Sequence, residues 1–478
     1  MKLISGSFVG PILTCVYLFS MSVLQPLFWL ARGINFIYYQ LIIVNLVQQF
    51  VYPKAFNVNT HLNPHSLDNP RQILENYHFF LKHNPFGKKC SAYEITKADG
   101  TVLRGLLYVP ESIKVDQWKN GFLWFEGTNS SSLQNHLDSA IRIADQSKKI
   151  LVSVDHQGIG WSDGKVHREI NQITDDMEQC IKDTIIYAAG QADLSPNEIA
   201  KKSIIYGHSL GGGLSVAVAD RLNNEGQPIK AFSWASFAST SAVARELFGG
   251  VFLRISIFIL MYYLITKASS LSFIFSTMWG SFAVFSLLTI SSHYMVKYDK
   301  GILLPFFDRV FISPLLKLFG WQLDVSTRAK GLLSKGKLLC GHIMRHPNLM
   351  PRDPSLNKYA MLSGEDGFIT SGASLTNVLA QDSDQLSESL TDDSADTNQL
   401  KNILNGSCCI NNTGGFLHEM YIHTLGPNQA DYIASENGRA VFKSQIDRIS
   451  FFASDEYTRI FDEKVLRQST TVTKGVSV

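Results

Sequence analysis

A serine flanked by glycines is the feature of this 478-residue sequence that most directly indicates chemistry. Gly207, Ser209 and Gly211 form a G-x-S-x-G pattern. An apolar run at 203–206 enters this pattern and an apolar-periodic helix leaves it, which is the context that a nucleophile on a strand-to-helix turn requires. Glycines two residues either side let the backbone approach itself without a Cβ clash. The pattern predicts that Ser209 is a nucleophile presented above a sheet.

Two backbone N–H groups are expected to stabilise the negative charge that such a reaction develops. Leu210 follows the serine at a helix N-terminus, where the dipole and free N–H groups favour an anion. Thr128 lies in the stretch 125–129, at the carboxyl end of a buried apolar run where a second donor is needed. We therefore expect the N–H groups of Thr128 and Leu210 to form an oxyanion hole.

The segments that must position these residues alternate between short apolar runs and helical patterns. Runs of this kind suit strands buried on both faces of a parallel sheet. A hairpin with Asp99-Gly100 at its turn precedes them, at 91–109. The alternation predicts an α/β fold with a doubly wound, mostly parallel sheet. The apolar runs lie at 121–125, 150–154, 203–206 and 229–234.

These motifs resemble those of the α/β-hydrolase superfamily, in the branch of monoacylglycerol lipases, serine-aminopeptidase-like hydrolases and membrane-anchored α/β-hydrolase-domain proteins. That branch carries D-x-x-G-x-G-x-S after its fourth strand and G-H-S-x-G-G after its fifth, and residues 155–162 and 207–212 match the two patterns. His208 is a usual family residue that is expected to pack beneath the serine. Where the branch has a histidine before the glycine that follows its third strand, this chain has Glu126.

The resemblance implies a catalytic acid and then a histidine downstream of the serine. The acid is expected after a strand that ends at Leu362, in the stretch 363–369. Asp366 is the preferred residue there, and its neighbour Glu365 is the alternative. In this scheme the acid would hold the imidazole of the histidine in the productive tautomer.

The histidine is expected after the last strand, at 407–411. His418 is the preferred residue, and His423 is the weaker alternative. His418 would take the proton of the Ser209 hydroxyl, which is a poor nucleophile at neutral pH. We expect no metal ion and no cofactor.

Uncharged stretches predict association with a membrane. No Asp, Glu, Lys or Arg occurs in the 29 residues between Lys2 and Arg32, or in the 21 residues between Arg32 and Lys54. About 20 apolar residues cross a hydrocarbon core. This region is therefore long enough for two crossings, or for one crossing and one interfacial helix.

A third uncharged stretch, 268–296, lies inside an insertion at 241–354. The strands expected around Phe232 and Met361 belong to one sheet, so the insertion must leave and return on one side of any bilayer. A hairpin of two crossings and an interfacial lid both satisfy this condition. An apolar cover over a serine nucleophile would indicate an acyl-lipid substrate delivered from the membrane.

The predicted organisation has a discontinuous α/β-hydrolase core. A mobile acidic loop is expected within the core, because 381–400 is rich in Ser and Asp. The predicted parts are membrane segments at 1–53, a linker at 54–90, the core at 91–240 and 355–450, the insertion at 241–354, the acidic loop at 381–400 and a C-terminal tail at 451–478.

Composition excludes several other classes of function. The formal net charge of +2 gives no strong positive potential that would attract nucleic acid. The six cysteines form no C-x-x-C pair, which argues against a zinc site or a disulfide framework. The sequence thus predicts a membrane-associated serine hydrolase acting on a lipid or other acyl ester, and no protein partner can be predicted. The alternatives are a thioesterase or serine peptidase, or a catalytically idle interaction module.

Overall fold

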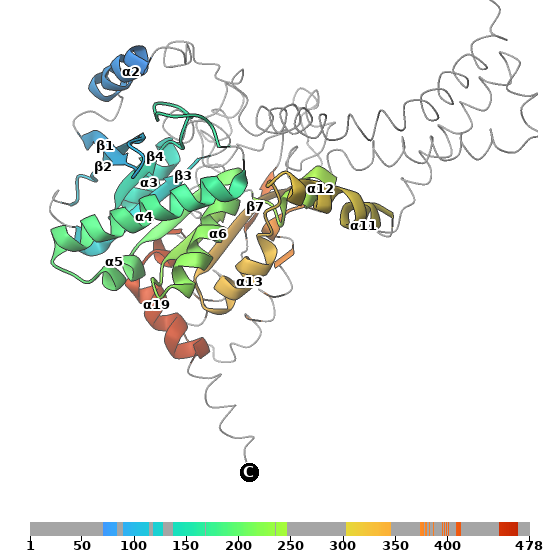
Figure 1. The fold of residues 1–478 in the computed structure, drawn as a ribbon. Helices are drawn as coiled ribbons and strands as arrows, with labels where there is room; N and C mark the ends of the chain where they lie inside the picture. The colour runs from blue at the N-terminus through green and yellow to red at the C-terminus, as the bar shows by residue number, and fades with distance from the viewer. Residues whose placement is uncertain are drawn as a thin grey trace, which may run out of the picture. The chain divides into compact units, whose positions relative to one another are not determined.

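Figure 1 shows the computed structural model of the chain, which comprises two compact units. Residues 48–243 and 320–478 form the larger unit, and residues 1–47 and 244–319 form the smaller one. The structure describes residues 70–83, 89–113, 118–127, 137–167, 169–234, 236–245, 303–345, single positions between 373 and 400, 408–412 and 449–466.

An eight-stranded sheet organises the larger unit, with the strand order β1-β2-β4-β3-β5-β6-β7-β8. The pairs β1–β2 and β2–β4 are antiparallel, and every other neighbouring pair is parallel. The strands are β1 (Cys90–Thr96), β2 (Val102–Tyr108), β3 (Phe122–Glu126), β4 (Ile150–Val154), β5 (Ile204–His208), β6 (Lys230–Trp234), β7 (Leu338–Arg345) and β8 (Cys408–Asn412).

The central strands β3, β4, β5 and β6 are buried at every residue. Their side chains alternate between two covered faces, and this explains why each reads as a continuous apolar run. The predicted α/β class and the mostly parallel sheet are confirmed, and the arrangement fits the α/β-hydrolase fold.

Helices cover both faces of the sheet (Figure 1). On one face, side chains of α3 and α19 pack with Leu123 and Phe125 of β3. On the other, α6 packs against β5 and β6, and α4 and α13 pack against α6. In the described part of this unit, the α-helices of seven residues or more are α2 (Pro70–His83), α3 (Leu137–Ser147), α4 (Ile170–Ala192), α5 (Pro196–Lys202), α6 (Leu210–Asn224), α13 (Ser326–Ser334) and α19 (Asp455–Phe461).

The strand that pairs with β6 differs from the one expected at 358–362. It is β7, Leu338–Arg345, in parallel register with Ala231 opposite Leu338. The chain therefore rejoins the sheet inside the segment 241–354 that sequence analysis assigned to the insertion. A Cβ at Gly341 would lie 2.2 Å from the indole of Trp234, so this glycine makes room for a buried tryptophan. The stretch 358–362 lies outside the described residues.

The C-terminal residues assigned to a tail instead close the core. Tyr457, Ile460 and Phe461 of α19 are buried. The buried Nζ of Lys230 donates hydrogen bonds to the carbonyl oxygens of Phe452 (2.9 Å) and Ser454 (3.0 Å). This buried side chain ties the amino-terminal end of β6 to the chain just before α19.

The acidic segment 381–400 is helical at each of its positions that the structure describes apart from Ser394. Leu400 is fully buried. The carboxylates of Asp382 and Asp396 lie 3.1 Å from the Lys330 ammonium and 3.4 Å from the Arg459 guanidinium, respectively. The described positions of this segment therefore include one buried leucine and two carboxylates paired with basic side chains of neighbouring helices.

None of the helices within the described ranges is long and apolar enough to cross a bilayer. The uncharged stretches before Lys54 and at 268–296, which carried the membrane prediction, lie outside those ranges.

Candidate active site

Ser209 occupies the turn between β5 and α6 in a strained backbone conformation. Its φ and ψ angles are 54° and −117°. The two other non-glycine residues with positive φ in the described part of the chain are Lys148 and Asp193, and Asp193 is an ordinary left-handed helix cap. Such conformations cost on the order of 1–3 kcal/mol and persist only where surrounding structure enforces them. The Ser209 N–H donates to the Trp234 carbonyl (2.9 Å), which ties the turn to the neighbouring strand β6.

Two glycines allow this turn, because backbone atoms occupy the space that a side chain at either position would need. A Cβ at Gly207 would lie 2.1 Å from the carbonyl oxygen of Gly211. A Cβ at Gly211 would lie 2.0 Å from the carbonyl oxygen of Gly127 and 2.5 Å from that of Glu126. The loop after β3 therefore lies directly against the first turn of α6, beside Ser209.

The same contact brings the expected oxyanion region to the serine. Leu210 is the first residue of α6, so its N–H has no carbonyl acceptor within the helix. Gly127, at the start of the predicted oxyanion loop, lies one residue before Thr128 and against the helix that Leu210 begins. His208 is fully buried beneath the turn. Thr128 lies outside the described residues, so its role remains a prediction.

The remaining predicted site residues also lie outside the described residues. They are Asp366, Glu365, His418 and His423. Ser209 is half-buried at the carboxyl end of the parallel strands, the edge at which the loops that follow β7 and β8 also begin.

A buried pair that sequence reasoning missed lies beside the predicted oxyanion loop. Nε2 of His156 lies 2.7 Å from Oε1 of Glu126, and only 9% and 1% of the two side chains are exposed. Burial lowers the pKa of His156, but the Glu126 carboxylate, with smaller contributions from Asp155 and Asp176, outweighs this effect and the net pKa is raised. Glu126, which departs from the family pattern, thus has a histidine partner at the end of the adjacent strand β4.

Both residues of this pair are visible in the sequence, but their pairing could be inferred only from knowing which strands are neighbours in the sheet. β3 and β4 are parallel neighbours, with Phe125 opposite Ser153, so the residues that follow them meet at one edge. An acid after one strand and a histidine after the next can therefore pair.

The stability that the pair contributes is expected to decrease as pH rises. The pKa of His156 is raised above that of an unfolded histidine, about 6.5. Its contribution is therefore fully present below about pH 6.5 and is lost as pH rises through the folded-state pKa. The measurement compares denaturant unfolding of the wild type and His156→Gln between about pH 5.5 and 9, with exposed His78→Gln as the control. A stability difference that stays constant or grows with pH would contradict this assignment.

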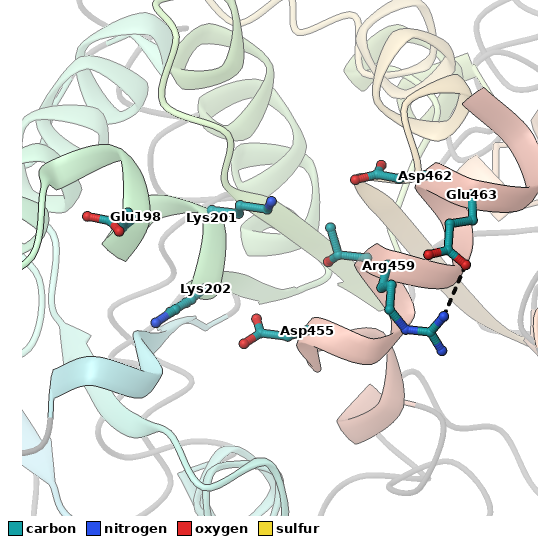
Figure 2. A pocket seen from close by; sticks show the side chains of 8 residues that line it. Glu198, Lys201, Lys202, Asp455, Arg459, Asp462 and Glu463 are labelled. Atoms are coloured by element: carbon teal, nitrogen blue, oxygen red, sulfur yellow. Dashed lines mark hydrogen bonds and ion pairs between the residues drawn. The ribbon is translucent and has the colours of Figure 1, made fainter. Parts of the chain in front are cut away.

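A charged crevice elsewhere on the larger unit is unsuited to acyl transfer. Figure 2 shows it between α5 and the C-terminal segment 455–463, with Lys201, Lys202, Asp455 and Asp462 among the side chains that line it. Lys202 precedes β5 and Ser209 follows it, so the crevice and the serine lie at opposite ends of that strand. Its acidic and basic side chains are mixed, and Arg459 pairs with Glu463 at 3.0 Å.

Comparisons with known proteins give partial likenesses. No family model matches the sequence, and no curated protein matches it. A hyperthermophilic esterase from the archaeon Pyrobaculum calidifontis is 16% identical over 35% of this chain and 52% of its own, with a TM-score of 0.26. An alpha-beta hydrolase from Vibrio vulnificus is 15% identical over 42% and 60%, with a TM-score of 0.30. A thermostable esterase from Pseudomonas putida is 14% identical over 36% and 52%, with a TM-score of 0.26.

The chain thus spans little more than half the length of the solved structures that it matches. Likenesses of this extent carry no argument about activity. The strand order, the parallel strands around β5 and the strained serine between two obligatory glycines fit an α/β-hydrolase type of fold.

Proposed function

We propose that this protein is a membrane-associated serine hydrolase that cleaves an acyl ester of a lipid through an acyl-enzyme on Ser209. The strained backbone of Ser209, at the tip of β5 and beside the Gly127 loop, is the observation that carries the proposal. An interaction module does not require a serine in a strained backbone conformation, whereas a nucleophile must project from its turn. The strain therefore favours an enzyme over an idle α/β-hydrolase fold.

The proposed reaction has two halves. The Ser209 hydroxyl oxygen attacks the ester carbonyl while His418 accepts its proton, and Asp366 orients the imidazole. In this scheme the backbone N–H groups of Leu210 and Thr128 donate hydrogen bonds to the oxyanion. The alcohol leaves with the proton held by His418. Water, deprotonated by His418, then attacks the acyl-enzyme and releases the carboxylic acid and the free serine.

A lipid substrate is favoured by the uncharged stretches at 3–31, 33–53 and 268–296, which would hold the protein at a membrane. A thioesterase or a serine peptidase would use the same nucleophile, acid and base. Comparing hydrolysis of oxygen esters, thioesters and amides of one acyl chain separates these candidates. Oxygen esters of long acyl chains are expected to be the best substrates.

The acid and the base are tested by single substitutions. Asp366→Asn and His418→Ala are each expected to lower kcat for a p-nitrophenyl ester by roughly 10⁴-fold, because each disables proton transfer from Ser209. Glu365→Gln and His423→Ala are the matched controls and should stay within a few-fold of the wild type. A large loss of kcat in His423→Ala, together with an active His418→Ala, would show that His423 is the catalytic base.

The position of β7 adds one comparison to this series. Because β7 ends at Arg345, the sequence that follows it reaches Asp353 before Asp366. Asp353→Asn should retain activity if Asp366 is the acid. Loss of activity in Asp353→Asn, together with an active Asp366→Asn, would show that Asp353 is the catalytic acid.

A further inference from the structure

A helical segment of the smaller unit carries large apolar side chains that are open to solvent. It runs without interruption through α11 (Leu303–Phe307), a wider turn η6 (Asp308–Ile312) and α12 (Ser313–Leu318), since Phe307, Ile312 and Ser313 at the junctions are all right-handed helical. Five side chains form what we call the apolar face, and each is between 44% and 62% exposed. They are Phe306, Val310, Phe311, Leu315 and Leu318.

The wider turn aligns these side chains. The Ser313 N–H donates to the Asp308 carbonyl, an i to i+5 hydrogen bond that defines a π-helical turn. In an unbroken α-helix, at about 100° per residue, Phe306 and Leu315 would point in opposite directions. A π turn rotates each residue by only roughly 80°, and this brings all five side chains within about a quarter of the circumference.

The charges of the segment have one sign at its exposed surface. Arg309 and Lys317 are exposed, whereas Asp308 is half-buried and its carboxylate lies 3.6 Å from the Arg245 guanidinium. The outward side therefore presents aromatic and aliphatic groups flanked by two cations and by no exposed acid of the segment. This is the pattern of helices that lie in the plane of an anionic bilayer surface.

We propose that the segment 303–318 docks on an anionic lipid surface, with the apolar face entering the interface and with Arg309 and Lys317 at the level of the headgroups. The inference deepens the membrane association proposed above and rests on it. A second copy of the chain fits less well, because a two-fold contact through the apolar face would bring two pairs of cations together. In the sequence, six residues separate the segment from the uncharged stretch 268–296.

The test measures membrane contact at single positions of the full-length protein. An environment-sensitive fluorescent amino acid replaces Phe311 or Leu315, and the protein is reconstituted in liposomes that contain phosphatidylglycerol and a headgroup-region nitroxide lipid. Ile186 of α4, 61% exposed, provides the matched control position. Quenching at 311 and 315 should exceed that at 186 by at least threefold. Equal quenching at the three positions would overturn the proposal.

Two further measurements separate the alternatives. Arg309→Gln with Lys317→Gln should lower the quenching at 311 to the level seen in phosphatidylcholine alone, whereas Lys119→Gln with Lys335→Gln, two exposed lysines elsewhere, should not. Concentration-dependent energy transfer between copies, with little quenching by lipid, would assign the apolar face to a second copy and overturn the lipid proposal. Hydrolysis of a short soluble ester by the same samples reports the serine site, so a failed docking surface and a failed hydrolase remain distinguishable.

Discussion

Replacing Ser209 by alanine is expected to lower kcat for ester hydrolysis by about 10⁴- to 10⁶-fold, the usual consequence of losing a triad nucleophile. The substitution removes one oxygen and leaves the turn in place, because the hydrogen bond from the residue 209 N–H to the Trp234 carbonyl is a backbone interaction. The loss should therefore occur without a large change in stability. The measurement is turnover of p-nitrophenyl butyrate by the full-length protein.

Ser334→Ala serves as the control for the serine substitution. Ser334 ends α13 and is exposed, with its hydroxyl donating to the Gly331 carbonyl (3.1 Å). Its replacement should leave turnover unchanged. A Ser209→Ala protein that kept more than a tenth of the wild-type turnover would show that another group is the nucleophile.

Gly211→Ala is expected to lower kcat by about 10²- to 10³-fold, the range found when one oxyanion donor is lost. The added Cβ would stand 2.0 Å from the Gly127 carbonyl oxygen and 2.5 Å from that of Glu126. Backbone atoms cannot rotate away as a flexible side chain could, so the loop after β3 must move off the first turn of α6. The predicted donor Thr128 would move with it.

Gly190→Ala in α4 is the matched control, because a Cβ at that helical glycine meets nothing within 4 Å. It should leave kcat unchanged and raise the free energy of unfolding by roughly 0.5–1 kcal/mol. Activity of Gly211→Ala within twofold of the wild type would mean that the contact between the loop and α6 does not position the reaction.

The central strands and the serine turn could be predicted from the sequence because their determinants are local. Each of β3 to β6 is a short apolar run, and the glycines around Ser209 lie within two residues of it. The need for glycine at this turn could be inferred from the sequence, since a strand enters the turn and a helix leaves it.

The features that could not be predicted depend on partners distant in sequence. Gly341 and His342 interrupt the apolar pattern of β7, and only the ring of Trp234, more than 100 residues earlier, explains the glycine. Glu126 looked like an unexplained departure until the sheet placed His156 beside it. The partners of Asp382 and Asp396 likewise lie on α13 and α19, and so their acidic segment resembled a free loop.

Covalent labelling with a fluorophosphonate tests the central claim most directly, because these reagents phosphonylate an activated serine and leave ordinary serines unmodified. The protein is labelled in its native and heat-denatured forms, and the modified residue is identified by peptide mass spectrometry. The account predicts one label per native chain, on Ser209, with none on denatured protein or on Ser209→Ala. A native, folded protein that takes up no label, or carries it on a different serine, would contradict the assignment of Ser209 as the nucleophile.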